Sequence, residues 1–280
     1  METQNIEDIR LGHRVVGTNP LRQQTQPASE IDPAKWRAVK LNMVQGDVEY
    51  NLAFLRPLSW IEATGAKTGG SIHMELHEMG LDGQAEVISI NPCPEIEPDD
   101  GTGRNVVTGT MAHPGDNILH LDITGLDEPL GVTDTHPIWS ETRQDFVVAG
   151  QLEVGEQFRT LTGESATLTK IHPHRGPPEM VFNLEVDAEH VYAVAGNGLL
   201  VHNDCDDTID LFRAVSPEEF DDIMATGGFR PGPNSLSVKQ FGHDLDEVIN
   251  VTDQPPLIDA AAVVRTSVPR HVFDMLDPAR

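Results

Sequence analysis

The chemistry that this sequence could perform is concentrated in the pair His202-Asn203, which ends the stretch GNGLLVHN (residues 196–203). The side-chain amide of an asparagine can attack its own backbone carbonyl and close a five-membered succinimide, which breaks the bond to the next residue. A fold that holds the reacting atoms in a near-attack geometry gains a large effective molarity for this intramolecular step. The departing amine needs a proton, and histidine is the side chain with a suitable pKa. The pair therefore predicts cleavage of the chain after Asn203.

A second group of chemical interest lies in GVTDTHPIWS (residues 131–140), where Thr133 and His136 stand three residues apart after a predicted strand. A Thr hydroxyl and a His nitrogen on the two sides of a turn can bracket one peptide bond. One of them polarises the scissile amide while the other protonates its leaving nitrogen. The T-x-x-H arrangement therefore indicates a second site of peptide-bond chemistry.

Residues 1–203, which must position these groups, have the pattern of short antiparallel strands. Apolar residues alternate with polar ones in NILHLDI (residues 117–123) and EMVFNLEV (residues 179–186), as in half-buried strands. HVYAVAGNGLLVH (residues 190–202) is typical of two strands joined by a Gly-Asn-Gly turn. A short helix is expected at LSWIEAT (residues 58–64). Because no βαβ alternation is present, we expect a mainly β, antiparallel assembly.

The pattern changes after Asn203. SPEEFDDIMATGG has the signals of a helix, with Ser216 as N-cap, Pro217 at the first position and Glu219 closing a capping box. The apolar stripe of this helix consists of Phe220, Ile223 and Met224. A second stripe, in GHDLDEVINV, consists of Leu245, Val248 and Ile249. AAVVRTSV predicts a strand. Residues 204–280 are therefore expected to form a small α+β domain, with the boundary at 203/204.

Composition limits the classes of partner. The chain has 45 acidic against 19 basic residues and a net charge of −26, and residues 204–280 alone hold 15 acidic against 6 basic ones. Both parts are acidic, so neither offers the basic surface that neutralises phosphates, and nucleic acid is not expected as a partner. A basic partner, such as an immunity protein or a cationic surface patch, is compatible with this charge, as is solubility alone.

Other classes of protein and of site are also not expected. No run approaches the roughly 18 apolar residues of a membrane span, and METQNIEDIR lacks the features of a secretory signal. The two cysteines, Cys93 and Cys205, build neither a disulfide framework nor a Cys-rich zinc site. We interpret both as free thiols.

Two histidine-containing stretches were considered as metal sites. In SIHMELHEM the candidate ligands His73, Glu75 and His77 alternate with apolar residues, which indicates a strand. His73 and His77 then lie about 13 Å apart, too far for one ion to bridge them. HPH (residues 172–174) is interpreted as a turn within the loop HPHRGPPE. The sequence therefore predicts no metal site.

The two chemical motifs and their surroundings resemble the Hint superfamily, which comprises inteins, hedgehog autoprocessing domains and the pretoxin-Hint modules of bacterial polymorphic toxins. THPIWS followed by GQLEVGEQFRT resembles the second block of that superfamily, and VFNLEVDAEHVYAVAGNGLLVHN resembles its two C-terminal blocks. IEDIRLGHRVV is similar to its I-x-x-I-x-x-G-D-x-V stretch, with His13 in place of the usual Asp. The resemblance covers residues 5–203 and is strongest over 131–203.

The resemblance implies a horseshoe-shaped, all-β Hint fold for residues 1–203. It also implies which residues form the site of autoprocessing: Thr133, His136, His190, His202 and Asn203. No cofactor is implied for this chemistry.

The start of the chain departs from the family pattern. In the family a nucleophilic Cys or Ser opens the first block, well before the stretch that IEDIRLG resembles, whereas only five residues precede Ile6 here. We therefore expect no N-to-S acyl shift by this polypeptide alone, and Cys93, in a Pro-rich loop, does not replace the nucleophile. Thr133 and His136 would serve such a shift if an upstream segment of a larger toxin supplied the Cys.

The C-terminal junction departs as well. Splicing requires Cys, Ser or Thr directly after the Asn, and here Asp204 stands before Cys205. We expect cleavage alone, with Asn203 cyclising and His202 assisting, to release residues 204–280 as a toxin domain. Export would then take place as part of a larger toxin system.

The released segment has a resemblance of its own. LFRAVSPEEFDDIMATGGFRPGPNSLSVKQFGHDLDEVI resembles small toxin domains that follow Hint modules, in particular the ADP-ribosyltransferase-like group. In that group an Arg on the first strand, here Arg213, contacts NAD, and Ser235 and Ser237 match a short Ser-rich strand. A late catalytic Glu is missing, since the last acidic residues are Asp274 and Asp277. The alternative functions are therefore an inert Hint module that presents an NAD-dependent transferase, and a truncated remnant without function.

Overall fold

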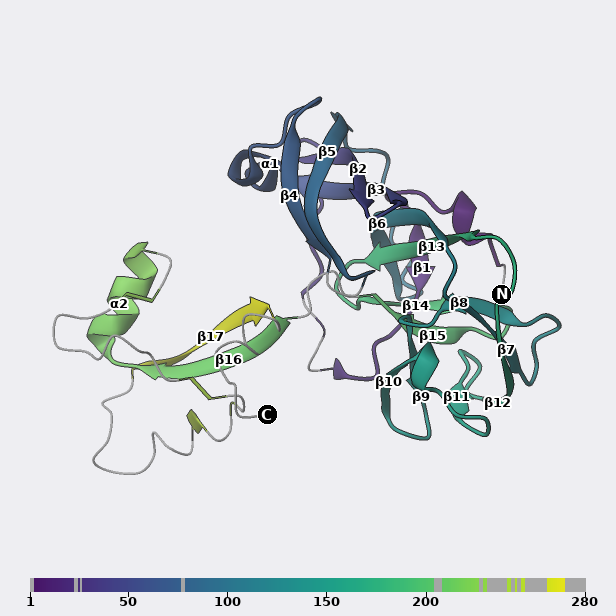
Figure 1. Cartoon of the computed structure of the whole chain (residues 1–280). Coiled ribbons are helices and arrows are strands. Elements are labelled where there is room, and N and C mark those ends of the chain that lie inside the picture. Colours follow the sequence, from purple (N-terminus) through teal and green to yellow (C-terminus); the bar gives the residue numbers. More distant parts are fainter. Residues whose placement is uncertain are drawn as a thin grey trace. The chain divides into compact units, whose positions relative to one another are not determined.

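A computed structural model of the chain describes residues 3–22, 25, 27–76, 79–203, 208–226, 229–230, 241–242, 245, 248–249 and 261–269. The chain divides into two compact units, Met1–Cys205 and Asp206–Arg280 (Figure 1). Each unit is described by itself.

Seven strands of the first unit form one antiparallel sheet, in the order β1-β6-β3-β2-β5-β4, with β13 paired to β6. Their bounds are β1 Arg14–Val16, β2 Trp36–Gln45, β3 Val48–Pro57, β4 Ser71–Leu76, β5 Leu81–Pro92, β6 Arg104–Gly115 and β13 Glu179–Val186. The long strand β6 pairs with β1, β3 and β13 and therefore ties distant segments of the chain together.

Two smaller antiparallel sheets complete the first unit, in the orders β11-β12-β7-β8 and β10-β9-β15-β14. The strands of the former are β7 Ile118–Ile123, β8 Leu130–Thr133, β11 Gln157–Arg159 and β12 Ser165–Pro173. Those of the latter are β9 Pro137–Ser140, β10 Asp145–Val148, β14 Val191–Val194 and β15 Leu199–His202. Short helical turns lie at η1 Ile6–Asp8 and η4 Ala149–Gln151.

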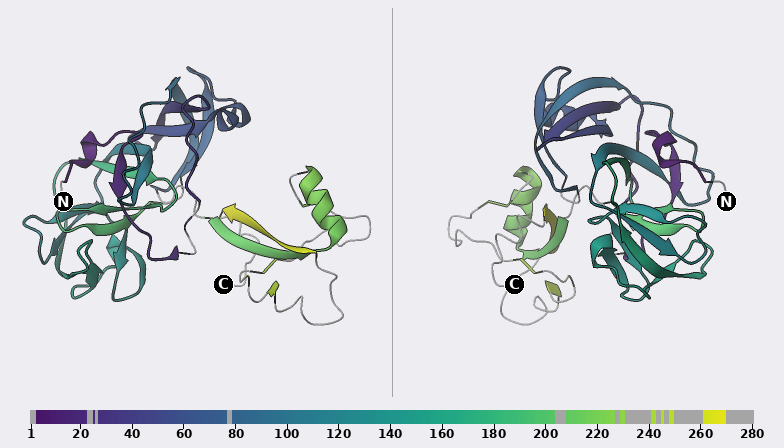
Figure 2. Two further views of the ribbon diagram at one scale, coloured as in Figure 1. Left: turned by 180° about the vertical axis from the view of Figure 1, so that it is seen from behind. Right: turned by 45° about the vertical axis from the view of Figure 1, so that its right-hand side comes forward.

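The first unit contains two hydrophobic cores. One lies among β6–β9, β11–β13 and β14–β15 and includes Leu121, Ile138 and Phe158, and the other lies among β2–β6 and includes Phe54. Strand β6 contributes to both, because Val107 belongs to the first core and Met111 to the second. In both views of Figure 2, β2–β5 form one end of the first unit, and the two smaller sheets form the other.

The prediction of a mainly β, antiparallel first region is confirmed. Strands β7, β13, β14 and β15 lie where alternating apolar residues predict them. The one predicted helix is α1 (Leu58–Thr64), and Gly65 ends it in the left-handed region, with φ 66°. The alternation in β13 is incomplete, however, since the Met180 side chain, expected on the buried face, is 52% exposed.

One predicted turn is wrong. Strand β12 continues through His172 to Pro173, because it pairs with β7 as far as the register His172↔His120 and Pro173↔Leu119. Only His174 begins the loop. The strand predicted at His73 is confirmed as β4, with Ile72, Met74 and Leu76 buried, while His77 lies outside the described residues.

The second unit contains an antiparallel pair, β16 (Thr208–Val215) and β17 (Ala262–Pro269), and the helix α2 (Pro217–Thr226). Ser216 caps α2, since its Oγ accepts a hydrogen bond from the backbone N–H of Glu219 at 3.3 Å. Met224, predicted on the apolar stripe, is 71% exposed, so the buried face is narrower than expected. Most of the segment predicted as a second helix lies outside the described residues.

Within the described part of the chain, no helix has both the length and the apolar character needed to cross a membrane.

Candidate functional site

The pairing of three strand ends places Asn203 between two histidines. Strand β15 pairs with β14 in the register Val191↔His202, and the next pair along the ladder, His190 and Asn203, is joined by a hydrogen bond of 2.8 Å from Asn203 N–H to His190 O. On its other side β15 pairs with β9 at Val201↔Ile138. That register, continued by two residues, brings His136 level with Asn203.

Asn203 is a buried polar residue held by one strong contact. Its side chain is 1% exposed, and Nδ2 donates a hydrogen bond of 2.6 Å to the carbonyl of Leu184 on β13. Oδ1 is shielded from solvent and has no hydrogen-bond partner among the described residues. An unpaired buried acceptor costs roughly 1–3 kcal/mol, and such exceptions in native folds call for a reason. The Asn203 amide is therefore fixed through its nitrogen, while its oxygen has no partner among the described residues.

The T-x-x-H segment forms a tight turn after β8, as predicted. The N–H of His136 donates to the carbonyl of Thr133 at 3.0 Å, which closes the turn. Asp134 O and His136 O accept hydrogen bonds from Gly150 and Ala149, at 2.7 and 2.9 Å. A Cβ at Gly150 would lie 3.2 Å from the carbonyl oxygen of Asp134, so the close approach favours glycine there. These two hydrogen bonds and the close packing hold the turn in contact with η4.

His136 and His202 are electrostatically coupled. Burial, and to a smaller extent the neighbouring His202, lower the pKa of His136 to about 4. His136 is therefore neutral at neutral pH. The ring of His202 lies against Phe146 of β10, with 4.8 Å between ring centroids, and Phe146 in turn packs edge-on against Trp139.

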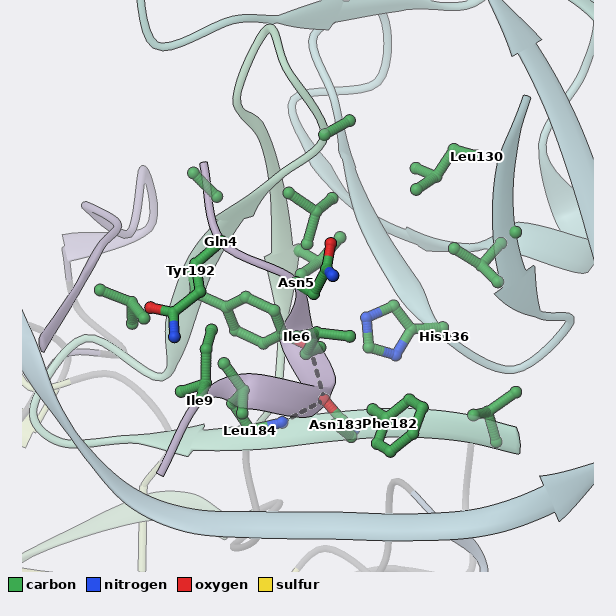
Figure 3. A pocket seen from close by; sticks show the side chains of 18 of the residues that line it. Gln4, Asn5, Ile6, Ile9, Leu130, His136, Phe182, Asn183, Leu184 and Tyr192 are labelled. Atoms are coloured by element: carbon green, nitrogen blue, oxygen red, sulfur yellow. Dashed lines mark hydrogen bonds between the residues drawn. The ribbon is translucent and has the colours of Figure 1, made fainter. Parts of the chain in front are cut away.

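A pocket of about 880 Å³ opens beside this turn (Figure 3). His136 projects into it, together with Tyr192 and Phe182, and the N-terminal segment lines it with Asn5 and Ile6. Thr133, Thr135 and Val201 also line it. Residues of the T-x-x-H motif, of strand β15 and of the first segment of the chain therefore line the same pocket.

Asn183 and Tyr192 form a polar contact in this pocket that the sequence analysis missed. Asn183 Oδ1 accepts hydrogen bonds from the Tyr192 hydroxyl at 2.8 Å and from the N–H of Leu184 at 2.9 Å (Figure 3). The same Leu184 holds Asn203 through its carbonyl. The pair thus fixes the strand that orients the reactive amide. Its signal is weak in sequence, because the two residues are nine positions apart on different strands.

His190 contributes its backbone to the site. It adopts the left-handed region, with φ 54°, which is uncommon for a residue other than glycine. The preceding Glu189 is held by the N-terminal segment, since its carboxylate accepts from Asn19 N–H at 2.6 Å and pairs with Arg22 at 2.8 Å. These contacts fix the turn that points the His190 carbonyl at Asn203.

Two further predicted residues, Cys93 and Arg213, are described by the structure. Cys93 is half-buried in the loop after β5, where burial raises the pKa of its thiol, and it does not line the pocket. In the second unit, both Nε and Nη2 of Arg213 donate to the Glu219 carboxylate at 3.1 Å. Ser235 and Ser237 lie outside the described residues.

Comparison with known families confirms part of the resemblance. A family model described as the pretoxin HINT domain matches residues 95–204. The match includes Thr133, His136, His190, His202 and Asn203. It does not include the N-terminal stretch with His13, and it gives no identity to residues 206–280.

Solved structures that match the chain include inteins and an intein-like domain. They include a bacterial intein-like domain from Clostridium thermocellum (23% identity, 60% of this chain and 99% of that chain covered, TM-score 0.32) and an intein from a hyperthermophile (13% identity, 60% and 96% covered, TM-score 0.31). A third is the transcription factor IIB Mvu mini-intein (10% identity, 60% and 97% covered, TM-score 0.31). No curated protein matches the chain.

Proposed function

We propose that residues 1–203 are an autoprocessing module that cleaves the peptide bond after Asn203 and thereby releases residues 204–280. The observation that carries this proposal is the state of Asn203, whose side chain is buried and fixed by Leu184, and whose Oδ1 has no hydrogen-bond partner among the described residues. Asn197 also has unpartnered side-chain atoms among the described residues, but it has neither a hydrogen bond that fixes its Nδ2 nor a histidine directly before it.

The proposed reaction is balanced within the chain. Nδ2 of Asn203 forms a bond to its own carbonyl carbon, and the bond from that carbon to the nitrogen of Asp204 breaks. Nδ2 loses one proton, and the leaving nitrogen gains one. The products are residues 1–203 with a C-terminal succinimide and residues 204–280 with a free amine.

The two histidines have different roles in this proposal. His136 is neutral at neutral pH, because burial lowers its pKa to about 4. His136 is therefore poorly suited to be the acid of this step, and we assign that role to its neighbour His202. His202 is adjacent to the scissile bond and acts as the acid that protonates the departing amine. The neutral His136 faces the pocket.

The pretoxin HINT match supports the biological setting of the proposal. A module of this family, joined to a further compact unit, fits a protein in which cleavage frees a C-terminal effector within a larger toxin system. NAD binding through Arg213 and an immunity protein as partner stay predictions.

The proposal is tested by incubating the purified full chain at several pH values and following intact masses over time. We expect a fragment of 77 residues and a complementary fragment that ends in a succinimide or its hydrolysis products. Asn203→Ala should abolish both fragments.

Asn197→Ala is the matched control, because Asn197 is also buried and lies in an Asn-Gly pair of the preceding turn. This variant should cleave at the wild-type rate. Wild-type protein that stays intact at every pH, or cleavage that persists in Asn203→Ala, would contradict the proposal.

A further inference from the structure

Three side chains with metal-ligating atoms meet at one end of the first unit. His120 extends from β7, His174 from the loop that follows β12, and Glu179 from the start of β13. One ligand atom of each lies within 4.8 Å of the other two. His120 Nε2 is 3.4 Å from His174 Nδ1, and His174 Nδ1 is 3.6 Å from Glu179 Oε1.

The protonation of His174 is set by its surroundings. Its Nε2 lies 2.9 Å from the carbonyl of Pro177, which can only accept, so the proton is on Nε2. In the neutral ring, Nδ1 then presents a lone pair toward His120 and Glu179. A backbone carbonyl that fixes the tautomer of a histidine in this way is the usual support of a metal-ligating imidazole.

The loop is built around the His174 ring. The side chain is only 9% exposed, and a Cβ at Gly176 would come within 2.7 Å of two ring atoms. Glycine at this position is therefore required for the ring to occupy its place. The ring orientation is fixed by both the hydrogen bond and the packing.

The spacing of the ligand atoms fits a tetrahedral ion. For bonds of about 2.0–2.2 Å, two ligands of a tetrahedral Zn²⁺ lie about 3.3–3.5 Å apart. The separations from His174 Nδ1 to His120 Nε2 and to Glu179 Oε1, 3.4 and 3.6 Å, are close to this ligand–ligand distance. The third separation, between His120 and Glu179, is at most 4.8 Å, and Glu179 is exposed and can adjust.

Without an ion, this arrangement is poorly satisfied. His120 Nε2 can donate to His174 Nδ1, but 3.4 Å is long for such a bond. In the neutral ring, the Glu179 carboxylate also faces the lone pair of His174 Nδ1. A divalent cation replaces this repulsion by three bonds.

We propose that His120, His174 and Glu179 bind a zinc ion, with water as the fourth ligand. Two neutral imidazoles and one carboxylate are a ligand set that Zn²⁺ accepts, and three protein ligands leave one position open. The ion joins β7 and the β12–β13 loop, and therefore two of the sheets, at a point the proposed cleavage does not use. The net charge of −26 favours cation binding further.

The test is calorimetric titration of the full chain, freed of metal by chelation, with ZnCl₂. We expect one Zn²⁺ per chain, and a Tm that rises by about 5 °C or more at a hundredfold excess over Kd. His120→Ala and His174→Ala should each weaken binding at least tenfold. Glu179→Gln, at an exposed position that does not endanger folding, should also weaken binding.

His172→Ala is the matched control. His172 lies two residues from His174 and contacts Asp122 at 3.1 Å instead of the cluster, so this variant should bind as the wild type does. Co²⁺ gives a second readout, because the intense visible bands of a tetrahedral complex should appear in wild type and be lost in Glu179→Gln. Absence of binding, or binding that survives in all three ligand variants, would overturn the proposal.

Discussion

The two hydrophobic cores of the first unit are built from similar apolar side chains but differ in what is buried beside them. The core around β2–β5 contains Phe54, Leu41 and Met43, and among the described residues no buried polar side chain lies on these four strands. Next to the other core lie buried polar residues: Asn19, Ser140, Glu156, Thr160 and Asn203. Burial of polar groups costs free energy unless they are paired. Of these residues, Asn19, Ser140, Glu156 and Thr160 have hydrogen-bond partners, whereas Oδ1 of Asn203 has none among the described residues. The difference teaches that the β2–β5 region is an apolar scaffold, while the other region holds one group that stability alone would not select.

The two regions meet at one buried ion pair. Arg56 of β3 donates two hydrogen bonds of 2.8 Å to Glu185 of β13, across the intervening β6. Thr108 of β6 donates to the same carboxylate at 2.6 Å, and the guanidinium lies over the Phe54 ring at 4.5 Å. This contact connects the scaffold to the strand that holds Asn203.

The largest effect on stability is expected in the scaffold. Phe54→Ala should lower the free energy of unfolding by about 4 kcal/mol, because it removes a fully buried ring and leaves a cavity. Urea unfolding measures this. The folded fraction should still cleave at the wild-type rate, and a lost cleavage activity in folded protein would break the distinction between the regions.

The second-largest effect on stability is expected at the Arg56–Glu185 ion pair. Glu185→Ala should cost about 3 kcal/mol, because it removes the carboxylate that faces the mostly buried Arg56 guanidinium. The double variant Arg56→Met with Glu185→Leu should recover much of that loss, as measured by the same unfolding curves. If the single variant were as stable as wild type, the pair would not connect the regions.

The free energy of unfolding of the first unit should depend on pH through His136, which lies beside the core with the buried polar residues. The pKa of a histidine in the unfolded chain is about 6.5, whereas burial holds that of His136 at about 4. Between these values the unfolded state binds a proton that the folded state does not, so stability falls as pH decreases from 6.5 to 4. The loss attributable to this residue is roughly 3 kcal/mol. The free energy of unfolding of wild type and of His136→Asn should be measured between pH 4 and 6.5. The same pH dependence in both proteins would contradict the prediction.

His202→Gln should separate chemistry from stability. We expect cleavage after Asn203 to slow about a hundredfold, the size of a general-acid contribution, which corresponds to about 2.7 kcal/mol. The free energy of unfolding should change far less. The pKa of His136, followed by NMR, should rise, because the neighbouring charge is removed, and should stay below 6.5, because the residue is still buried. A fall in this pKa would contradict the assigned coupling.

The smallest effect is expected on the outer face of the scaffold. Val44 of β2 is 62% exposed, so Val44→Thr should change stability by less than about 0.5 kcal/mol and leave cleavage unchanged. A large change in either quantity would show that this face carries a function.

Much of the secondary structure could be predicted from sequence, because it depends on local periodicity and end signals. The helix at 58–64, the strands at 179–186 and 199–202, and the Ser216 cap of α2 all follow from patterns a few residues long. The failures are positions where tertiary contacts override the pattern. Met180 and Met224 fit an apolar stripe but are exposed, and β7 extends β12 into a segment rich in Pro and His.

The candidate site was predicted as a set of residue types but not as an arrangement. His202-Asn203 and Thr133-His136 were recognised because each pair is local in sequence. Their proximity depends on the register Val201↔Ile138, which joins segments about sixty residues apart. The carbonyl of Leu184 gave no signal, because a backbone group carries no residue type.

The sequence by itself determined which groups are present: an Asn beside a His at a strand end, a T-x-x-H turn and a set of strands with alternating apolar residues. Only the tertiary structure decided which of these groups are neighbours. It buried the Asn203 amide with one end unsatisfied, made His136 neutral by desolvation and brought His120, His174 and Glu179 together from two strands and a loop. The physical reason is that reactivity, pKa and metal affinity depend on distances and solvent exclusion, which chain order does not encode locally.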